Sequence, residues 1–151
     1  MTASATFEEL SGEALALYGT ARAVFAVEAD DPAQAARFAR SWAQQLEAAG
    51  RQVRVVAAEE ALQGAGDPDE QVPTAAQLRE AIVRPHRTQA QPGEVLLVHG
   101  SRLLDRERLG LWQYSVRLTD ADTAIPVRRT LTGVDALVDP DTLQRLQLDF
   151  C

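Results

Sequence analysis

The sequence predicts an α/β domain with a three-layer α/β/α arrangement around a mostly parallel, five-stranded sheet. Two observations carry this prediction. Short apolar runs rich in Val, Leu and Phe alternate along the chain with longer segments whose apolar residues recur at helical spacing. The apolar runs also contain few polar residues, which is typical of strands that are buried on both faces of a parallel sheet. Right-handed βαβ units then place the helices on both faces.

The first elements follow from capping and apolar spacing. Thr6 and Glu9 have the spacing of a capping box, so the first helix is predicted over residues 6–18. Its inward residues are expected to be Phe7, Leu10, Ala14, Leu17 and Tyr18. Residues 23–28, AVFAVE, predict a buried strand.

A second helix is predicted to begin at Pro32. Asp31 suits the N-cap and Pro32 the first helical position, and Gly50 ends the helix. Its apolar stripe comprises Ala35, Phe38, Ala39, Trp42, Leu46 and Ala49. Residues 52–58 predict a second strand, and the Gly- and Pro-containing segment 63–73 predicts a loop.

The third helix is predicted to start at its N-cap Thr74 and to stop near Pro85. Its inward side chains should be Leu78, Ala81, Ile82 and Val83. After a turn at Pro92-Gly93, residues 94–100, EVLLVHG, form the most strand-like run, and we expect this strand to be central in the sheet.

The remaining elements are short. A helix over 105–112 leads to a strand over 114–119, and another helix, broken near Pro126, leads to a last strand over 136–139. The segment from Asp141 onward fits either helix or strand. Trp42 and Trp112 are assigned to core packing.

Composition and charge restrict the class of protein. The chain has 151 residues, 46% of them hydrophobic, which predicts one domain over 1–151, with residues 1–20 as an N-terminal helix packed on it. The net charge of −7 disfavours nucleic-acid binding, because a phosphate backbone would be repelled. We expect no membrane association, since no apolar run is long enough to span a bilayer.

Metal sites and disulfides are disfavoured by the residues available. Cys151 is the only cysteine, so neither a disulfide nor a cysteine metal site can be built. His86 and His99 lack the patterned carboxylates of a zinc site, and the position of His86 at a helix end beside arginines is explained by the helix dipole. We therefore expect a cytoplasmic protein without a bound metal or cofactor.

The run EVLLVHGSRLLDRERLGLWQYSVRLT resembles a stretch of bacterial uridine kinase-like proteins, in which a strand ends in an acidic residue and Gly, and a short helix then ends in Leu-Trp. The Leu111-Trp112 pair and its spacing from Gly100 carry the likeness. It extends to TAAQLREAIVRP and to ARAVFAVEADDPAQAARFARSWAQQL, and covers about residues 20–140. The resemblance implies a P-loop NTPase-like fold of the nucleoside kinase branch. The lid of that family is missing from this sequence.

The resemblance also implies where phosphates would bind. A P-loop has the form G-x-x-x-x-G-K-[ST], in which Gly frees backbone N–H groups, Lys neutralises phosphate and the hydroxyl holds magnesium. In place of these residues the chain has Ala29, Gln34, Ala35 and Ala36, and the whole sequence contains no Lys. Asp30 and Asp31, in the same turn, would repel a triphosphate.

Other positions keep only part of the expected chemistry. Arg37 is the nearest cation to the lost lysine, either as its substitute or as a solvent-facing helix residue. Glu59 and Glu60 follow the second strand, where the resemblance implies an acidic pair that activates the nucleoside hydroxyl; a solvated loop pair is the alternative. His99 replaces an acidic residue near magnesium, and a buried packing role is the alternative.

Ser101 and the pair Arg128 and Arg129 are further candidate site residues. Ser101 follows His99 and Gly100, but the nucleophile-elbow pattern of serine hydrolases is absent. Arg128 and Arg129 correspond to basic residues ahead of the family's lid, or are surface charges.

Together these residues predict a non-catalytic uridine kinase-like protein that binds a protein partner, a ligand or another copy of itself. One alternative is a residual nucleotide- or nucleoside-binding phosphotransferase that uses Arg37, Glu59 and Glu60. Another is a decayed copy of a kinase that folds and does little. The turn at residues 28–36 distinguishes these hypotheses. A wide anion-binding nest would favour nucleotide binding, whereas a tight turn filled by Asp30 or Gln34 would oppose it.

Overall fold

A computed structural model describes residues 3–18, 21–61, 74–101, 103–104, 109–119 and 134–146. The helices and helical turns in chain order are α1 (Ala3–Tyr18), α2 (Pro32–Ala48), α3 (Ala58–Ala61), α4 (Ala75–Leu78), η1 (Arg79–Val83), α5 (Arg84–Gln89) and η2 (Leu109–Leu111). The strands are β1 (Val24–Glu28), β2 (Val53–Ala57), β3 (Val95–Gly100), β4 (Tyr114–Leu118), β5 (Ala136–Val138) and β6 (Arg145–Leu146).

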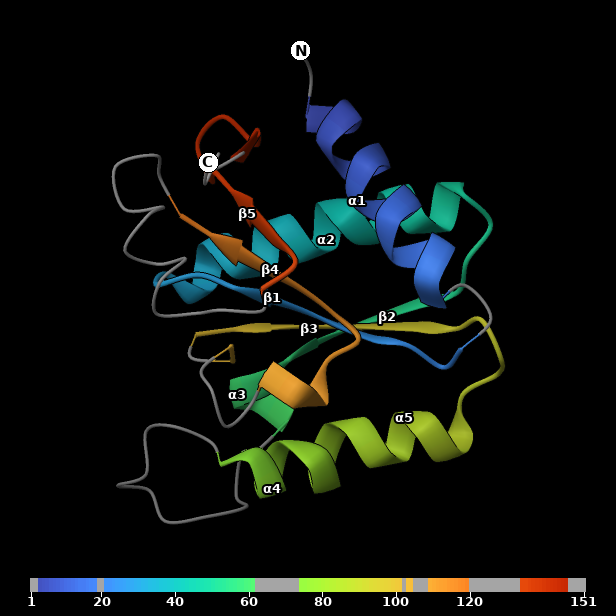
Figure 1. The fold of residues 1–151 in the computed structure, drawn as a ribbon. Coiled ribbons are helices and arrows are strands. Elements are labelled where there is room, and N and C mark those ends of the chain that lie inside the picture. The colour runs from blue at the N-terminus through green and yellow to red at the C-terminus, as the bar shows by residue number, and fades with distance from the viewer. Residues whose placement is uncertain are drawn as a thin grey trace, which may run out of the picture.

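The strands form one mostly parallel sheet between two helical layers. Helices α1 and α2 cover one face, and α3, α4 and α5 cover the other (Figure 1). The sheet has six strands in the order β2-β3-β1-β4-β5-β6. The predicted three-layer architecture is confirmed, and so is the interior position of β3, between β2 and β1.

The expected number of five strands is wrong by one. The additional strand, β6, pairs antiparallel with β5 through Leu137 with Leu146 and Val138 with Arg145. A strand this short has no periodicity that a sequence pattern could detect, which is why the segment after Asp141 remained open between helix and strand.

Each face of the sheet has its own apolar core. On the α1–α2 face, Phe25 stacks on Trp42 at a centroid distance of 5.6 Å, and Phe7 contacts Phe38 at 5.0 Å. Trp42 is fully buried, and its Nε1 donates to Ser11 Oγ at 3.0 Å. The opposite core is formed mainly by aliphatic side chains of the strands, α4, η1 and the segment around η2, and it includes Trp112. Both tryptophans therefore pack in the core, as predicted.

Helix α2 matches its prediction closely. Asp31 is the N-cap, and its Oδ1 accepts a hydrogen bond from Ala33 N at 2.9 Å. Beyond the last turn, Gly50 has φ +89°, a left-handed conformation that glycine adopts without a steric penalty. The buried stripe is as predicted except at Ala49, the C-cap, which is exposed.

Helix α1 begins earlier than predicted, at Ala3. Thr6 therefore lies inside the helix, where it is buried, and the proposed capping box with Glu9 is wrong. Leu17, expected to face inward, is 68% exposed. As predicted, Phe7, Leu10 and Ala14 face inward and join the α2-side core, and the partly buried Tyr18 packs against it.

The third helical segment starts as predicted and ends later. Thr74 and Gln77 form a reciprocal capping box at its start. The segment then continues past Pro85 to Gln89. In the π-helical turn η1, Arg84 N donates to Arg79 O, and this change in the backbone hydrogen bonds directly before Pro85 lets the helix accommodate the proline ring. Ala81, expected to be inward, is exposed.

Three predicted elements lie wholly or partly outside the described residues: the loop over 63–73, most of the helix over 105–112 and the helix near Pro126. In the described part of 105–112, residues 109–112, the structure has the single turn η2. Among the described helices, none combines the length and apolar character needed to cross a bilayer.

Candidate functional site

The carboxyl ends of β1 and β3 are the place where a ligand is expected. The two strands are neighbours, with Glu28 opposite Gly100. The chain leaves β1 toward α2 on one face, whereas it leaves β3 toward Leu103 and Leu104, which pack on the other face. In parallel α/β sheets, ligands bind where neighbouring strands send their connections to opposite faces.

The connection between β1 and α2 is short. Ala29, Asp30 and Asp31 alone separate Glu28 from the first residue of the helix. Ala29 is buried, and its N–H donates to Gly100 O at 3.2 Å. This bond joins the start of the turn to the end of β3 and extends the pairing of β1 with β3 by one residue.

The helix side of the turn is capped by Asp31. Its side chain accepts from Ala33 N, and its carbonyl oxygen accepts from Gln34 N at 3.0 Å. In a phosphate-binding nest, successive backbone N–H groups point toward one anion. Residues that alternate between right-handed and left-handed backbone conformations produce this arrangement. No residue of this turn has positive φ. Of the two shapes considered for residues 28–36, a wide nest or a tight turn, the structure has the tight turn, and it is Asp31, rather than Asp30 or Gln34, that bonds the backbone N–H groups at the start of α2.

Ala35 and Ala36, which the resemblance led us to expect in place of the Lys and the Ser or Thr of a P-loop, follow in the first turns of α2. Ala35 is fully buried in the core beside the sheet, and Ala36 is half-buried. Neither methyl group can contact an anion through a charge or a hydrogen bond.

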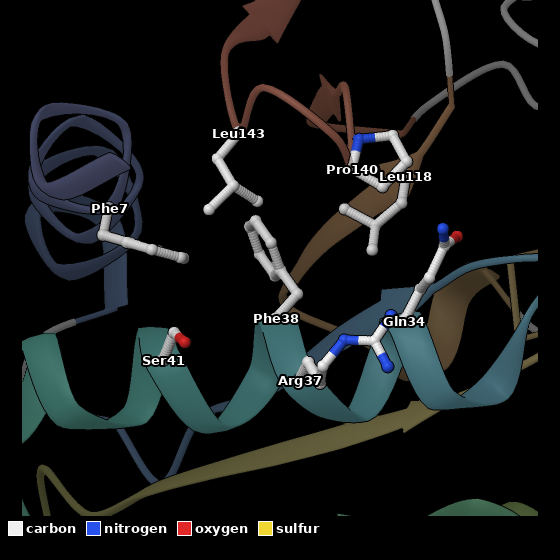
Figure 2. Close-up of a pocket in the computed structure, with 8 residues that line it drawn as sticks. All are labelled: Phe7, Gln34, Arg37, Phe38, Ser41, Leu118, Pro140 and Leu143. Atoms are coloured by element: carbon white, nitrogen blue, oxygen red, sulfur yellow. The ribbon is translucent and has the colours of Figure 1, made fainter. Parts of the chain in front are cut away.

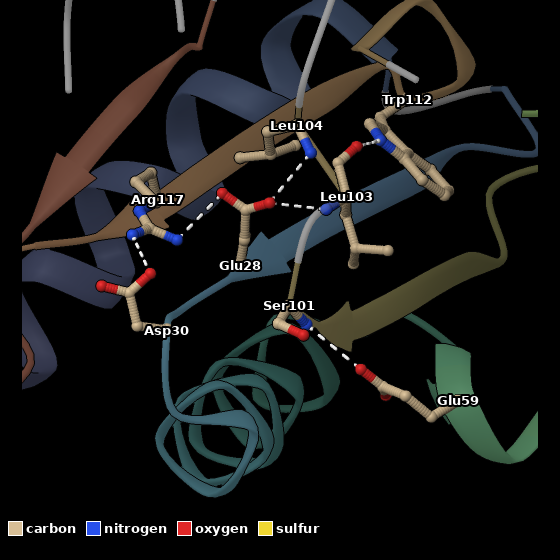
Figure 3. A network of polar contacts seen from close by, with 8 residues as sticks. All are labelled: Glu28, Asp30, Glu59, Ser101, Leu103, Leu104, Trp112 and Arg117. Carbon is tan, nitrogen blue, oxygen red and sulfur yellow. Dashed lines mark hydrogen bonds and ion pairs between the residues drawn. The ribbon is translucent and has the colours of Figure 1, made fainter. Parts of the chain in front are cut away.

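A buried ion pair that sequence reasoning missed lies at this edge. Arg117 Nη1 donates to Glu28 Oε2 at 3.0 Å, and Arg117 Nη2 donates to Asp30 Oδ1 at 2.7 Å. Glu28 Oε1 accepts from the backbone N–H groups of Leu103 and Leu104, at 2.5 and 3.1 Å. Figure 3 shows the Glu28 carboxylate between the Arg117 guanidinium and this backbone.

The signal for this pair was present in the sequence as two charged residues inside apolar strand runs. Glu28 ends the first run, and Arg117 lies within YSVRLT. A charge in a strand that is buried on both faces needs a partner of opposite sign. Their separation of 89 positions prevented the two from being matched before the strand order was known.

Glu59 lies against the end of β3. Its Oε1 accepts from Ser101 N at 3.2 Å, and a Cβ built on Gly100 would come within 2.8 Å of the same oxygen. The absence of a side chain at Gly100 therefore makes room for this carboxylate. Ser101 contributes its backbone to this contact, and Glu60 is exposed.

His99 lies close to the same carboxylates. It is buried at the end of β3, and burial is the main cause that lowers the pKa of its imidazole, with Glu59 and Glu60 opposing that change and Arg40 adding to it. A neutral ring is the form that this environment favours, in agreement with the packing alternative.

Arg37 and Gln34 lie elsewhere on α2. Both line a pocket toward α1 and the β5–β6 turn (Figure 2). Helix α3, which carries Glu59, lies on the opposite face of the sheet (Figure 1). The structure therefore does not bring Arg37 together with Glu59 and Glu60. Arg128 and Arg129 lie outside the described residues.

The side chains present at this edge do not fit a magnesium ion. The Glu28 carboxylate is already bonded to Arg117 and to two backbone N–H groups. Across the described residues, no three His, Cys, Asp or Glu side chains are grouped so that they could ligate a metal.

Comparison with solved structures identifies the architecture. A possible uridine kinase from Bacillus stearothermophilus has a TM-score of 0.58 at 13% identity, over 83% of this chain and 85% of that one. A putative fructose transport system kinase from Silicibacter sp. TM1040 has a TM-score of 0.59 at 17% identity, over 99% of this chain and 98% of that one. The chain has a P-loop kinase-like fold. At these identities the likeness concerns the fold alone, and no family model and no curated protein matches the sequence.

Proposed function

We propose that this chain is a P-loop kinase-like protein that does not transfer phosphate and acts by binding. The observation that carries the proposal is the turn between β1 and α2. The N–H group of Ala29 in this turn is bonded within the protein, and those of Ala33 and Gln34 in the first turn of α2 are bonded to Asp31. A triphosphate in a P-loop needs such groups free and pointing at its oxygens.

The charges at this edge support the same proposal. Phosphoryl transfer depends almost entirely on positioning and on cations that neutralise the transferred group. Arg117 contacts the turn through Asp30, and its guanidinium is bonded to both Glu28 and Asp30. A phosphate bound here would have to displace a carboxylate from that guanidinium and then lie beside the remaining acidic side chains.

The alternative of a residual phosphotransferase would require Arg37, Glu59 and Glu60 to act on one substrate. Arg37 lines a pocket with residues of α1, β4 and the β5–β6 turn, whereas the Glu59 carboxylate is held at Ser101. A substrate that contacted one of these groups would lie away from the other, so we prefer binding without chemistry.

The proposal is tested by incubating the purified protein with Mg·ATP and with uridine or fructose, the substrates named for the two structural neighbours. We expect neither ADP nor phosphorylated acceptor above a protein-free control. Arg37→Gln and Glu59→Gln are the informative variants, and Arg40→Gln is the matched control on the same helix. Turnover that falls in Arg37→Gln or Glu59→Gln but not in Arg40→Gln would refute the proposal.

A further inference from the structure

We propose that the pocket between α1, α2 and the β5–β6 turn binds a small amphipathic carboxylate, with an apolar body and one carboxyl group. The pocket has a volume of about 240 Å³. Figure 2 shows its residues converging from separate parts of the chain. The residues are Phe7, Gln34, Arg37, Phe38, Ser41, Leu118, Pro140 and Leu143.

The apolar part of the lining suits a ring or a branched chain. Phe7 and Phe38 contact each other across α1 and α2 at a centroid distance of 5.0 Å. Leu118 from the end of β4, with Pro140 and Leu143 from the β5–β6 turn, faces them (Figure 2). Ligand pockets commonly have this composition, mostly apolar with a few polar groups that fix orientation.

The polar part of the lining comes from one stripe of α2. Gln34, Arg37 and Ser41 lie at helical spacing on the face that borders the pocket. Within the described part of the chain, no hydrogen bond or ion pair is assigned to Arg37, in contrast to Arg117 and Arg145. A guanidinium binds a carboxylate through two parallel N–H···O bonds.

The charge of the lining selects an anion. The protein has a net charge of −7, yet among the described residues that line the pocket there is no Asp or Glu, and Arg37 is the one ionised side chain. A single cation matches a single carboxylate. A nucleoside triphosphate would bring several negative charges into a volume below the roughly 300–1,000 Å³ of pockets for drug-sized ligands.

The backbone at one rim is held in an uncommon conformation. Leu143 has φ +57°, although it is not glycine, and it is the one such residue in the described chain. Its N–H donates to Asp139 O at 2.8 Å, and Asp139 Oδ1 accepts from Asp141 N. This turn directs the Leu143 side chain toward Phe38, as Figure 2 shows. Left-handed non-glycine residues gather at functional sites.

This inference does not depend on the proposed function, because the pocket is separate from the turn between β1 and α2. Nucleotide binding at the turn would not exclude a carboxylate from this pocket, and an empty pocket would not show that the turn binds nucleotide.

The test is a titration of the full chain with phenylacetate, followed by amide NMR, with phenylacetamide and inorganic phosphate as comparison probes. We expect phenylacetate to shift the amide signals of Phe38, Leu118 and Leu143 in a saturable manner. Phenylacetamide should bind at least about tenfold more weakly, since it lacks the charge that Arg37 recognises. Equal binding of the two probes, or no saturable shift with phenylacetate at millimolar concentration, would overturn the inference. Tighter binding of phosphate than of phenylacetate would also overturn it.

Two variants locate the site. Arg37→Gln should weaken phenylacetate binding by about tenfold or more, whereas Arg40→Gln, the same change one turn along α2, should leave it unchanged. Ser41→Leu should reduce binding of phenylacetate and phenylacetamide alike, because it fills the pocket. Equal effects of Arg37→Gln and Arg40→Gln would show that general charge, rather than this pocket, attracts the anion.

Discussion

Glu28 and Arg117 stand opposite each other at the carboxyl ends of β1 and β4, and the guanidinium donates to the carboxylate at 3.0 Å. Both side chains are buried, at 5% and 10% exposed. Since the backbone of Leu103 and Leu104 donates to the same carboxylate, the pair links three segments of the chain. It lies directly beside the turn that a kinase of this fold would use for phosphate.

Removing the cation should destabilise the protein strongly. Arg117→Leu leaves the Glu28 carboxylate buried with backbone donors alone, and we expect the free energy of unfolding to fall by about 3 kcal/mol, the lower part of the range for breaking a buried pair. Urea unfolding measures this.

Asp30→Asn is the matched control, because it removes the other carboxylate that Arg117 contacts. The Asp30 side chain is 96% exposed, so its pair with Arg117 should contribute little. If Arg117→Leu and Asp30→Asn lowered the free energy of unfolding equally, burial of the Glu28–Arg117 pair would not be the cause of the loss.

A side chain at position 100 should displace Glu59. In Gly100→Ala, the new Cβ would lie within 2.8 Å of Glu59 Oε1, so the carboxylate must turn away and release Ser101 N. We expect a loss of about 1 kcal/mol, the usual net contribution of one hydrogen bond.

A double-mutant cycle isolates this contact. In a Glu59→Ala background the Gly100→Ala change should cost nearly nothing, since no carboxylate remains to be displaced. Additive losses of stability would mean that the cost of Gly100→Ala arises from another contact of β3.

The stability of the protein should fall as the pH falls below 6.5, the ordinary value for histidine. Burial lowers the pKa of His86 in the folded protein, with Arg54 adding to this and Glu94 opposing it. Between that lowered value and 6.5 the unfolded chain binds more protons than the folded chain, so each decrease in pH favours unfolding.

Thermal unfolding at a series of pH values between 5.5 and 7.5, a range set by the ordinary histidine pKa, measures the slope. His86→Gln should flatten it. Because burial also lowers the pKa of His99, some slope should remain in that variant. If the stability of His86→Gln changed with pH as steeply as that of the unaltered protein, the pKa of His86 would be the same in the folded and the unfolded chain. His86 does lie near the end of a helix, as predicted, but the residue is 2% exposed and its Nε2 lies 3.2 Å from Glu94 O, so its position involves burial in addition to the helix dipole.

Local chemistry predicted much of the fold. Asp31 and Thr74 cap helices where the sequence places them, and the apolar runs of β1 and β3 are buried strands, because caps and continuous hydrophobicity act over a few residues. Pro85 shows the limit of such rules. A proline inside a helix is disfavoured unless the backbone adjusts, and here the η1 turn supplies the adjustment.

The site was less accessible to sequence reasoning than the fold. Candidate residues were chosen by position after each strand, which found Glu59 but gave no partner for it, whereas Asp31 was matched to the start of its own helix because a cap acts over a few residues. Glu28 and Arg117 pair only because β4 lies beside β1, a strand order that no local pattern encodes. The pocket around Arg37 likewise depends on β6, the strand that was not predicted, since its turn carries Leu143.

A calorimetric titration of the unaltered chain with Mg·ATP tests most directly whether the turn between β1 and α2 holds a triphosphate. We predict no saturable heat at millimolar nucleotide, because Asp31 occupies the helix start and Arg117 is already paired with Glu28 and Asp30. Saturable binding with one nucleotide per chain, accompanied by amide shifts centred on residues 29–34, would contradict this account.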